Sequence, residues 1–342
     1  MSFYPSESHH LKDWVFGSLD FLRTKRNEIN EKARDNWKDV FRQISNESYE
    51  IDEMLLTSKE EETLISYYGR QLVEFCNHKQ LPFVSKYNAS ILYQRFFTNQ
   101  SVMDYDPRII IFTSISLALK LEEYGLHFTL EKLFGDVPGL NIQEVFRHEL
   151  IVCNTLRFHL YILNPRNTLE GLRLLYKKYY IDVLVVDEDL ENPDNKKTYN
   201  KKNQLISLLT KVILKAETYV LMILHTLCFL IYTPSQISIT LFDISARELN
   251  LPYSGDFLKK VLKEIHQANY LKSETETSHS SLSIIHSIRD LIIQTLETDR
   301  IAKERGHEHE EIETTRILDK LAKLQRRRNK EMKRRRKSSS QL

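Results

Sequence analysis

Lys120 and Glu149 are the residues whose types and spacing best suit recognition chemistry. Lys120 directly follows Ile109–Leu119, which contains no charged residue, and Glu149 lies in line with Val145 and Val152 at helical spacing. A carboxylate within an apolar stripe is costly unless it is paired or reaches water. Spacing alone leaves two interpretations open. Glu149 is either a boundary residue whose carboxylate reaches water, or half of a Lys120–Glu149 pair exposed on a groove between two helices, where it could hydrogen-bond a partner's backbone.

Other patterns that could support catalysis or metal binding are incomplete. His148-Glu149 begins like the zinc-protease motif HExxH, but Val152 stands where the second histidine should be. His307 and His309 lie among glutamates and fit a solvated surface better than a metal site. The glycines never form GxGxxG or GxxxxGK, which excludes nucleotide binding by those loops. We therefore expect no catalytic residue, no metal and no cofactor.

The composition favours an all-α fold. The chain has 342 residues, of which 41% are hydrophobic and 28% charged, as in ordinary globular proteins. It has only 8 glycines and 8 prolines, whereas glycine alone usually makes up about 7% of residues. Sandwiches, barrels and doubly wound sheets need many tight turns, and tight turns need these residues. The length predicts two domains, or one domain and a tail.

Charge is concentrated near the C-terminal end. Residues 321–337 hold ten Lys/Arg and one acid, so that segment is +9, and because the whole chain is +2 the remainder is −7. An acidic remainder is poorly suited to binding phosphates, so we expect that this part of the chain binds no nucleic acid directly. Two basic clusters predict a nuclear-targeting signal, with a solvated helix end as the alternative. Their residues are Arg326, Arg327, Arg328, Lys333, Arg334, Arg335, Arg336 and Lys337.

The cysteines and the most apolar stretch point to a reducing compartment and to no membrane span. Cys76, Cys153 and Cys228 are far apart and form no CxxC pair, which is typical of buried free thiols. Tyr219–Tyr232 is strongly apolar, but it is shorter than the ~20 residues that a bilayer needs. We interpret it as part of a helix buried on all sides.

The first half of the chain is predicted to form an N-terminal helix followed by a compact helical domain. The N-terminal helix, around Asp20–Phe41, has few apolar residues, so it must dock or stay loose. Ser58 and Glu61 have the spacing of a capping box. Asp106-Pro107 is typical of a helix start, and the uncharged helix after it should form the centre of the domain.

The second half repeats this pattern. Thr233-Pro234 opens a helix as Asp106-Pro107 does, which suggests two copies of one unit. The charged stretch Asp187–Asn203 predicts a surface loop, and Leu205–Tyr232 predicts a long apolar helix. Beyond Arg300 the chain is charged, which predicts a lone helix or disorder.

Several motifs resemble the cyclin family. The run from Ser116 to Glu123 (SLALKLEE) is similar to the third-helix motif of a cyclin box, and Glu149 with Leu156–Leu160 is similar to its fifth helix. Within the family the likeness is closest to the cyclin H group, through Tyr232–Ile237 (YTPSQI) and the Asn164-Pro165 entry into a second box. The resemblance implies two consecutive five-helix cyclin boxes with extra N- and C-terminal helices. The implied boundaries are 1–56 for the N-terminal extension, 57–162 and 163–272 for the boxes, and 273–342 for the C-terminal helices and basic tail.

The resemblance also implies a function. Cyclins are non-catalytic regulatory subunits that bind a cyclin-dependent kinase, and cyclin H belongs to the kinase module of transcription factor IIH, a nuclear complex. Its implied partners are the kinase, a ring-finger assembly factor and the remaining subunits of that factor. The implied outputs are phosphorylation of the RNA polymerase II C-terminal repeats and of other cyclin-dependent kinases. The kinase-binding residues carried over by the resemblance are Lys120, Glu123, Glu149, Leu117, Cys153 and Phe158.

The sequence leaves two other interpretations of the function open. One is a nucleic-acid-binding general transcription factor built on the same boxes, like the core of transcription factor IIB. That family carries a zinc ribbon with paired cysteines ahead of its repeats, and no cysteine precedes Ser58 here. The other is a purely structural helical scaffold. For Leu117 and Cys153, plain core packing competes with a role at the kinase surface.

Overall fold

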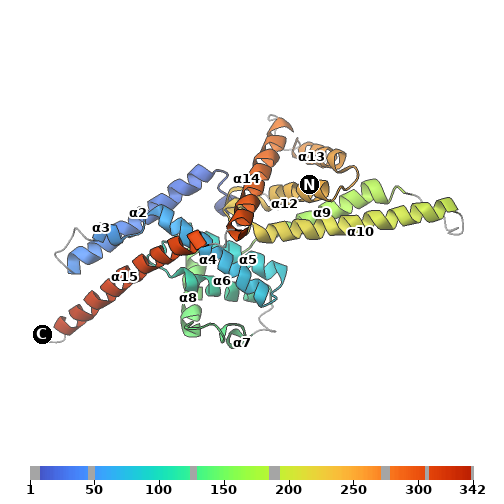
Figure 1. Cartoon of the computed structure of the whole chain (residues 1–342). Coiled ribbons are helices and arrows are strands. Elements are labelled where there is room, and N and C mark those ends of the chain that lie inside the picture. Colours follow the sequence, from blue (N-terminus) through green and yellow to red (C-terminus); the bar gives the residue numbers. More distant parts are fainter. Residues whose placement is uncertain are drawn as a thin grey trace. The chain divides into compact units, whose positions relative to one another are not determined.

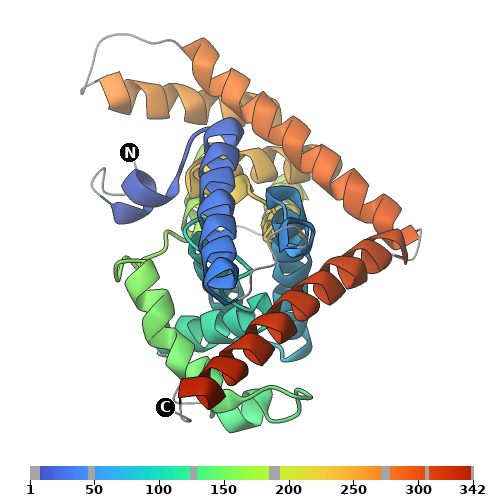
Figure 2. The ribbon, with the colours of Figure 1, turned by 90° about the vertical axis from the view of Figure 1, so that its left-hand side faces the viewer.

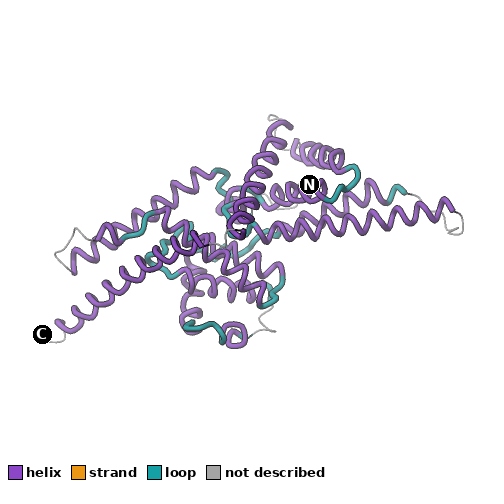
Figure 3. The backbone as a smooth tube through the Cα atoms, in the orientation of Figure 1, coloured by secondary structure: helices purple, strands orange, loops and turns teal. Residues whose placement is uncertain are grey.

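The computed structural model describes residues 8–44, 51–123, 129–184, 193–270, 278–304 and 308–339. The described residues form helices, turns and loops, with no strand among them (Figure 3). The all-α prediction is therefore confirmed. The chain divides into two helical units. The first helical unit comprises residues 16–160, 224–227 and 299–342, and the second comprises residues 1–15, 161–223 and 228–298.

The first helical unit is built around one apolar helix. Its described helices are α2 (Leu19–Ile44), α3 (Ile51–Met54), α4 (Ser58–His78), α5 (Phe83–Phe96), α6 (Pro107–Leu121), α7 (Leu130–Phe134), α8 (Ile142–Thr155) and α15 (Glu308–Ser339) (Figure 1). In α6 the Asp106 side chain accepts a hydrogen bond from Arg108 N at 2.8 Å, and Pro107 occupies the first turn. Residues 109–119 are all buried, and α6 packs against α4, α5 and α8. The predicted helix start and central position of α6 are confirmed.

The second helical unit has a matching central helix. Its helices are α1 (His9–Trp14), α9 (Pro165–Tyr176), the π-helical turn η2 (Lys177–Ile181), α10 (Pro193–Met222), α11 (Cys228–Ile231), α12 (Pro234–Glu248) and α13 (Ser254–Tyr270), with most of α14 (Ser278–Glu304). Thr233 forms a capping box with Gln236, and Pro234 occupies the first turn of α12. Helix α12 packs against α9, α10, α11 and α13. Pro107 and Pro234 therefore occupy matching positions, each in the first turn of the central helix of its unit, as the sequence predicted.

The predicted capping box of α4 was wrong by one residue. The capping box of α4 is formed by Thr57 and Glu60, one residue earlier than Ser58 and Glu61. Glu61 instead points into the unit, where it is 5% exposed and accepts a hydrogen bond from Ser101 Oγ. Because Thr57 and Ser58 are both good N-caps with a glutamate three residues later, the sequence pattern could not choose between the two registers.

The interpretation of residues 187–232 was also partly wrong. Residues 185–192 lie outside the described part, but α10 begins at Pro193, so residues 193–203 are helical rather than a loop. The apolar run does not form one helix, because α10 ends at Met222 and α11 begins at Cys228. Its most apolar part, Tyr219–Tyr232, contains no exposed residue, although several of its residues are only half-buried. No helix in the described ranges is long and apolar enough to cross a membrane. All three cysteines are buried free thiols, as predicted.

The C-terminal helix is docked, contrary to the prediction of a lone helix or disorder. Helix α15 packs against α2, α3 and α4 (Figure 1), and Figure 2 shows the same helix from another side. Lys320 Nζ lies 2.9 Å from Glu60 Oε2, which itself caps α4. The N-terminal helix α2 docks too, and Trp37 Nε1 donates a hydrogen bond of 2.8 Å to Asp104. Each helix also buries a few apolar residues, among them Trp37 and Phe41 of α2 and Leu321 and Leu324 of α15.

Candidate functional site

Lys120 and Glu149 form an ion pair at the surface of the first helical unit. Lys120 Nζ lies 2.7 Å from both carboxylate oxygens of Glu149. Ser116 Oγ, one turn before Lys120 in α6, donates a hydrogen bond of 2.6 Å to Glu149 Oε1. The Lys120 side chain is 48% exposed and the Glu149 side chain 16%. The structure therefore favours the paired interpretation over an isolated boundary carboxylate, and it leaves the ammonium accessible to another molecule.

An exposed apolar surface adjoins the pair. The Lys120 ammonium lies 5.2 Å from the centre of the Phe146 ring, which is close enough for a cation–π contact. One turn further along α8, Leu150 is 61% exposed, and Leu121 at the end of α6 is 41% exposed. None of these three residues was predicted from the sequence as part of a site. Phe146, Leu150 and Cys153 follow helical spacing, so α8 carries a second apolar stripe that could have been found by the same test as the first.

Leu117 and Cys153 lie beneath this surface. They are 7% and 9% exposed, respectively. Burial raises the pKa of the Cys153 thiol, and the nearby Glu149 carboxylate raises it further, so the thiol stays protonated. Both side chains support the two helices below the pair, with only an edge open to solvent. That placement fits the core-packing interpretation and leaves a contact with a partner as a prediction.

Phe158 is held outward by an unusual backbone. Arg157 and Phe158 have φ values of +52° and +58°, the left-handed region that bulky residues rarely adopt. Backbone hydrogen bonds fix this turn, with Phe158 N donating to Cys153 O at 2.8 Å and Arg157 N to Asn154 O at 2.9 Å. Phe158 is 61% exposed. The contact of Phe158 with a kinase stays a prediction.

Glu123 follows the end of α6, one turn beyond Lys120. It is exposed, has a φ of +56°, and its backbone N–H donates to Lys120 O at 3.2 Å. The structure thus brings Lys120, Glu149, Leu117 and Cys153 together on α6 and α8, and Glu123 is exposed just beyond the end of α6. We refer to Lys120, Glu149, Leu121, Phe146, Leu150 and Phe158 together as the α6–α8 surface.

The residues predicted to target the nucleus all lie in α15. Arg327 Nη1 lies 3.4 Å from the Met54 sulfur, and the Arg328 guanidinium lies 5.0 Å from the centre of the Trp37 ring. Arg326 is exposed. The backbone stays helical to Ser339, while the side chains after Lys330 lie outside the described part. Arg327 and Arg328 therefore contact the protein, although Arg328 also remains exposed to solvent.

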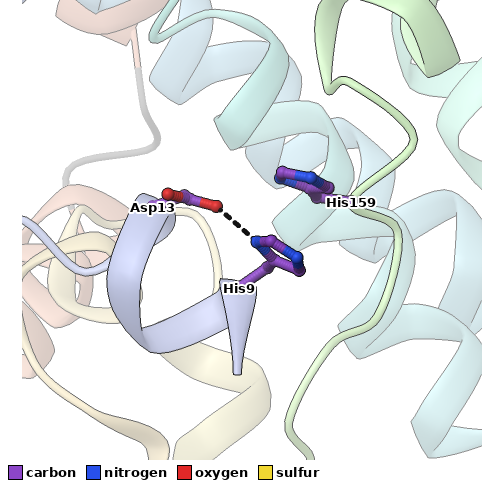
Figure 4. A group of neighbouring side chains, drawn as sticks. All are labelled: His9, Asp13 and His159. Carbon is purple, nitrogen blue, oxygen red and sulfur yellow. Dashed lines mark hydrogen bonds and ion pairs between the residues drawn. The ribbon is translucent and has the colours of Figure 1, made fainter. Parts of the chain in front are cut away.

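A histidine–carboxylate pair in the second helical unit offers a further set of potential metal ligands. His9 Nδ1 lies 2.9 Å from Asp13 Oδ2, one turn apart in α1 (Figure 4). His159, drawn in the same figure, belongs to the first helical unit. Two ligand groups at an exposed helix end fall short of the three or four protein ligands that a zinc site uses. The pair is an ordinary surface contact between residues four apart.

Comparisons with known proteins relate the chain to one group. It is 32% identical to "Cyclin mcs2" of Schizosaccharomyces pombe over 173 residues, which is 49% of this chain and 53% of that protein. It is 29% identical to "Cyclin-H" of Xenopus laevis over 189 residues, covering 54% and 55% of the two chains. The chain therefore spans about half the length of the curated relatives it matches. No protein-family model matches it.

Solved structures share the fold. A chain of the Chaetomium thermophilum CAK complex bound to ATP-gamma-S matches with a TM-score of 0.67 at 20% identity, covering 93% of this chain and 88% of that one. A chain of the yeast TFIIK (Kin28/Ccl1/Tfb3) complex matches with a TM-score of 0.58 at 21% identity, covering 84% and 99%. The fold likeness extends over most of the chain, well beyond the half that matches in sequence.

Proposed function

We propose that the chain is a cyclin of the cyclin H family, which it resembles over about half of its length, and that it is a non-catalytic regulatory subunit that binds and activates a cyclin-dependent kinase. The observation that carries the proposal is the α6–α8 surface, where the Lys120 ammonium of the ion pair contacts the exposed Phe146 ring, Leu150 is exposed one turn further along α8, and Phe158 is exposed beyond the end of that helix. Such a mixture of apolar anchors around a charged pair is typical of a binding surface. Neighbouring exposed apolar side chains such as Phe146 and Leu150 are typical of an interaction site rather than of a solvated helix face.

The surface would act on the kinase by holding a helix. Lys120 can donate to backbone carbonyls at the end of a partner helix, and Glu149 can accept from backbone N–H groups, while the apolar residues cover its hydrophobic side. In protein kinases, an inward position of the αC helix forms the Lys–Glu pair that orients the ATP phosphates. A cyclin that binds this helix in its inward position stabilises the active state by mass action, without contributing a catalytic group. Glu123 lies where it could extend the contact.

The proposed complex is the kinase module of transcription factor IIH. One of the structurally similar chains belongs to the yeast TFIIK complex of Kin28, Ccl1 and Tfb3. By this likeness, the proposed partners are a cyclin-dependent kinase, a ring-finger assembly factor and the remaining subunits of the factor. The proposed substrates are the heptad repeats of RNA polymerase II and other cyclin-dependent kinases. Nuclear localisation follows from this role, and the basic clusters of α15 would serve as the targeting signal.

Co-elution and hydrogen exchange test the binding surface. The purified full chain, mixed with its cognate cyclin-dependent kinase, should elute with it as one complex. Amides of residues 142–158 and of the last turn of α6 should exchange more slowly in the complex, because the kinase covers them. Amides of α13 serve as an internal reference. Co-elution with protection confined to other helices would reject the α6–α8 surface, and failure to co-elute would reject the function itself.

A further inference from the structure

One face of α15 is fixed against the first helical unit. Its buried residues recur at intervals of three or four, and they are Thr314, Ile317, Leu321 and Leu324. Arg328 continues the same row and lies over the Trp37 ring. Because these contacts set the rotation of the helix about its axis, they also determine which residues of α15 face away from the unit.

The opposite row of α15 consists of cations. At 3.6 residues per turn, Lys323, Arg326 and Lys330 lie on the far side from the docked row, and all three are exposed. The backbone remains helical to Ser339, so the same register continues through Lys333, Arg334 and Lys337. These six positions fall within an arc of about 100° and span ~21 Å along the axis. No acidic residue occupies that arc between residues 323 and 337. We call these six residues the outer basic row.

We propose that the outer basic row binds the phosphate backbone of double-stranded DNA. A straight helix, ~10–12 Å across, fits the ~12 Å major groove of a DNA duplex, where a line of cations meets phosphates along its length. Single strands are normally held by stacking on aromatic side chains, and residues 321–339 contain none. Duplex RNA has a deep, narrow major groove that side chains do not enter. The charge and shape of the row therefore fit duplex DNA best.

The acidic remainder of the chain does not oppose this inference. The −7 charge argues against a phosphate-binding surface on the body. The docked row, however, leaves Lys323, Arg326 and Lys330 exposed on the other side of α15, so the DNA would approach the helix from its solvent side. A row of lysines and arginines contacts phosphates more than base edges, so we expect little sequence preference.

The salt dependence of binding gives the expected magnitude. For six phosphate contacts, the slope of log K against log salt concentration is about −5. Between 50 and 200 mM salt, affinity should then fall by about three orders of magnitude. Neutralising three of the six cations should make the slope shallower by about 3.

The test uses the purified full chain and a fluorescein-labelled 24-base-pair duplex, followed by fluorescence anisotropy at 50, 100 and 200 mM salt. The variant K323Q/R326Q/K330Q neutralises the described half of the row. The variant K196Q/K197Q/K201Q removes the same charge from exposed positions of α10 and serves as the matched control. The first variant should lose at least tenfold in affinity at 50 mM and show a shallower slope, whereas the control should bind like the parent. Both variants should keep the parent melting temperature and full kinase activation, which separates this inference from the proposed function.

Three outcomes would overturn the inference. The first is a parent chain that does not bind the duplex at 50 mM salt. The second is an equal loss in both variants, which would mean that overall charge rather than the row governs binding. The third is equally tight binding to single-stranded DNA or to phosphatidylserine vesicles at matched phosphate concentration, which would make the row a general anion-binding or membrane-binding surface.

Discussion

Removal of either charge of the Lys120–Glu149 pair should weaken kinase binding while leaving the fold intact. The pair is at the surface, with the Lys120 side chain 48% exposed, and pairs of this kind contribute about 0–1 kcal/mol to stability. Glu149 also keeps its hydrogen bond from Ser116 when Lys120 is truncated. Lys120→Ala and Glu149→Ala should therefore lower the melting temperature by a few degrees at most.

The loss at the interface should be much larger. Truncation of one partner in a hydrogen-bonded interfacial charge pair costs about 2–5 kcal/mol, because the other charge is left buried and unpaired. At 1.4 kcal/mol per decade, this corresponds to a roughly 30-fold to several-thousand-fold increase in the Kd for the kinase. Because the two residues act on the same contact, the double variant should lose less than the sum of the single losses.

The assay is a titration of the cognate kinase with parent and variant chains, with circular dichroism and thermal melting on the same samples. Lys79→Ala is a matched control, since Lys79 Nζ lies 2.7 Å from Asp136 Oδ2 and 5.7 Å from the Phe75 ring centre, nearly the geometry of Lys120. The control should bind the kinase as tightly as the parent. The reasoning fails if Lys120→Ala or Glu149→Ala melts far below the parent while its folded fraction still activates the kinase fully.

Three further predictions concern stability and targeting. Burial raises the pKa of the Glu61 carboxyl to about 7, so the folded state binds the carboxyl proton more tightly than the unfolded state does. The protonated carboxyl therefore stabilises the fold fully below pH ~4.5, and this stabilisation is lost as the pH rises through 7. Glu61→Gln should remove up to roughly 3 kcal/mol of that pH dependence, measured by urea unfolding at pH 5 and pH 8; parallel curves for parent and variant would refute it. Leu324→Ala should weaken the free energy with which α15 docks on the first helical unit by about 2–5 kcal/mol. Amides of residues 308–330 should then exchange faster, and unchanged exchange would show that charged contacts alone hold the helix. Neutralising Lys333–Lys337 should lower nuclear accumulation of a tagged chain when its kinase partner is depleted, and full accumulation would assign targeting elsewhere.

The central helices could be predicted because their signals are local. A charge-free run of eleven residues after Asp106-Pro107 permits only a buried helix, and it became α6 with residues 109–119 buried. The central helices therefore need no knowledge of the distant segments that pack on them. The Lys120–Glu149 pair was one of two interpretations that the spacing left open, and the structure decided between them.

The features that were missed depend on the tertiary structure. Helix α15 docks through four buried residues in a mostly charged sequence, and so narrow a stripe is informative only when its receiving surface is known. The exposure of Phe158 follows from two left-handed residues, and backbone angles of ordinary residues are not encoded in a recognisable motif. The α4 capping box shows a third limit, because Thr57 and Ser58 are equally good candidates and only packing decides between them.

Activation of the cognate kinase by the purified chain is the most direct test of the central claim. Kinase activity toward an RNA polymerase II heptad-repeat peptide would be measured as the chain is titrated into a fixed amount of kinase. Activity should rise with added chain and saturate at one chain per kinase, while the chain alone transfers no phosphate. A kinase that binds ATP normally and yet stays at its basal rate at every concentration of the chain would contradict the claim.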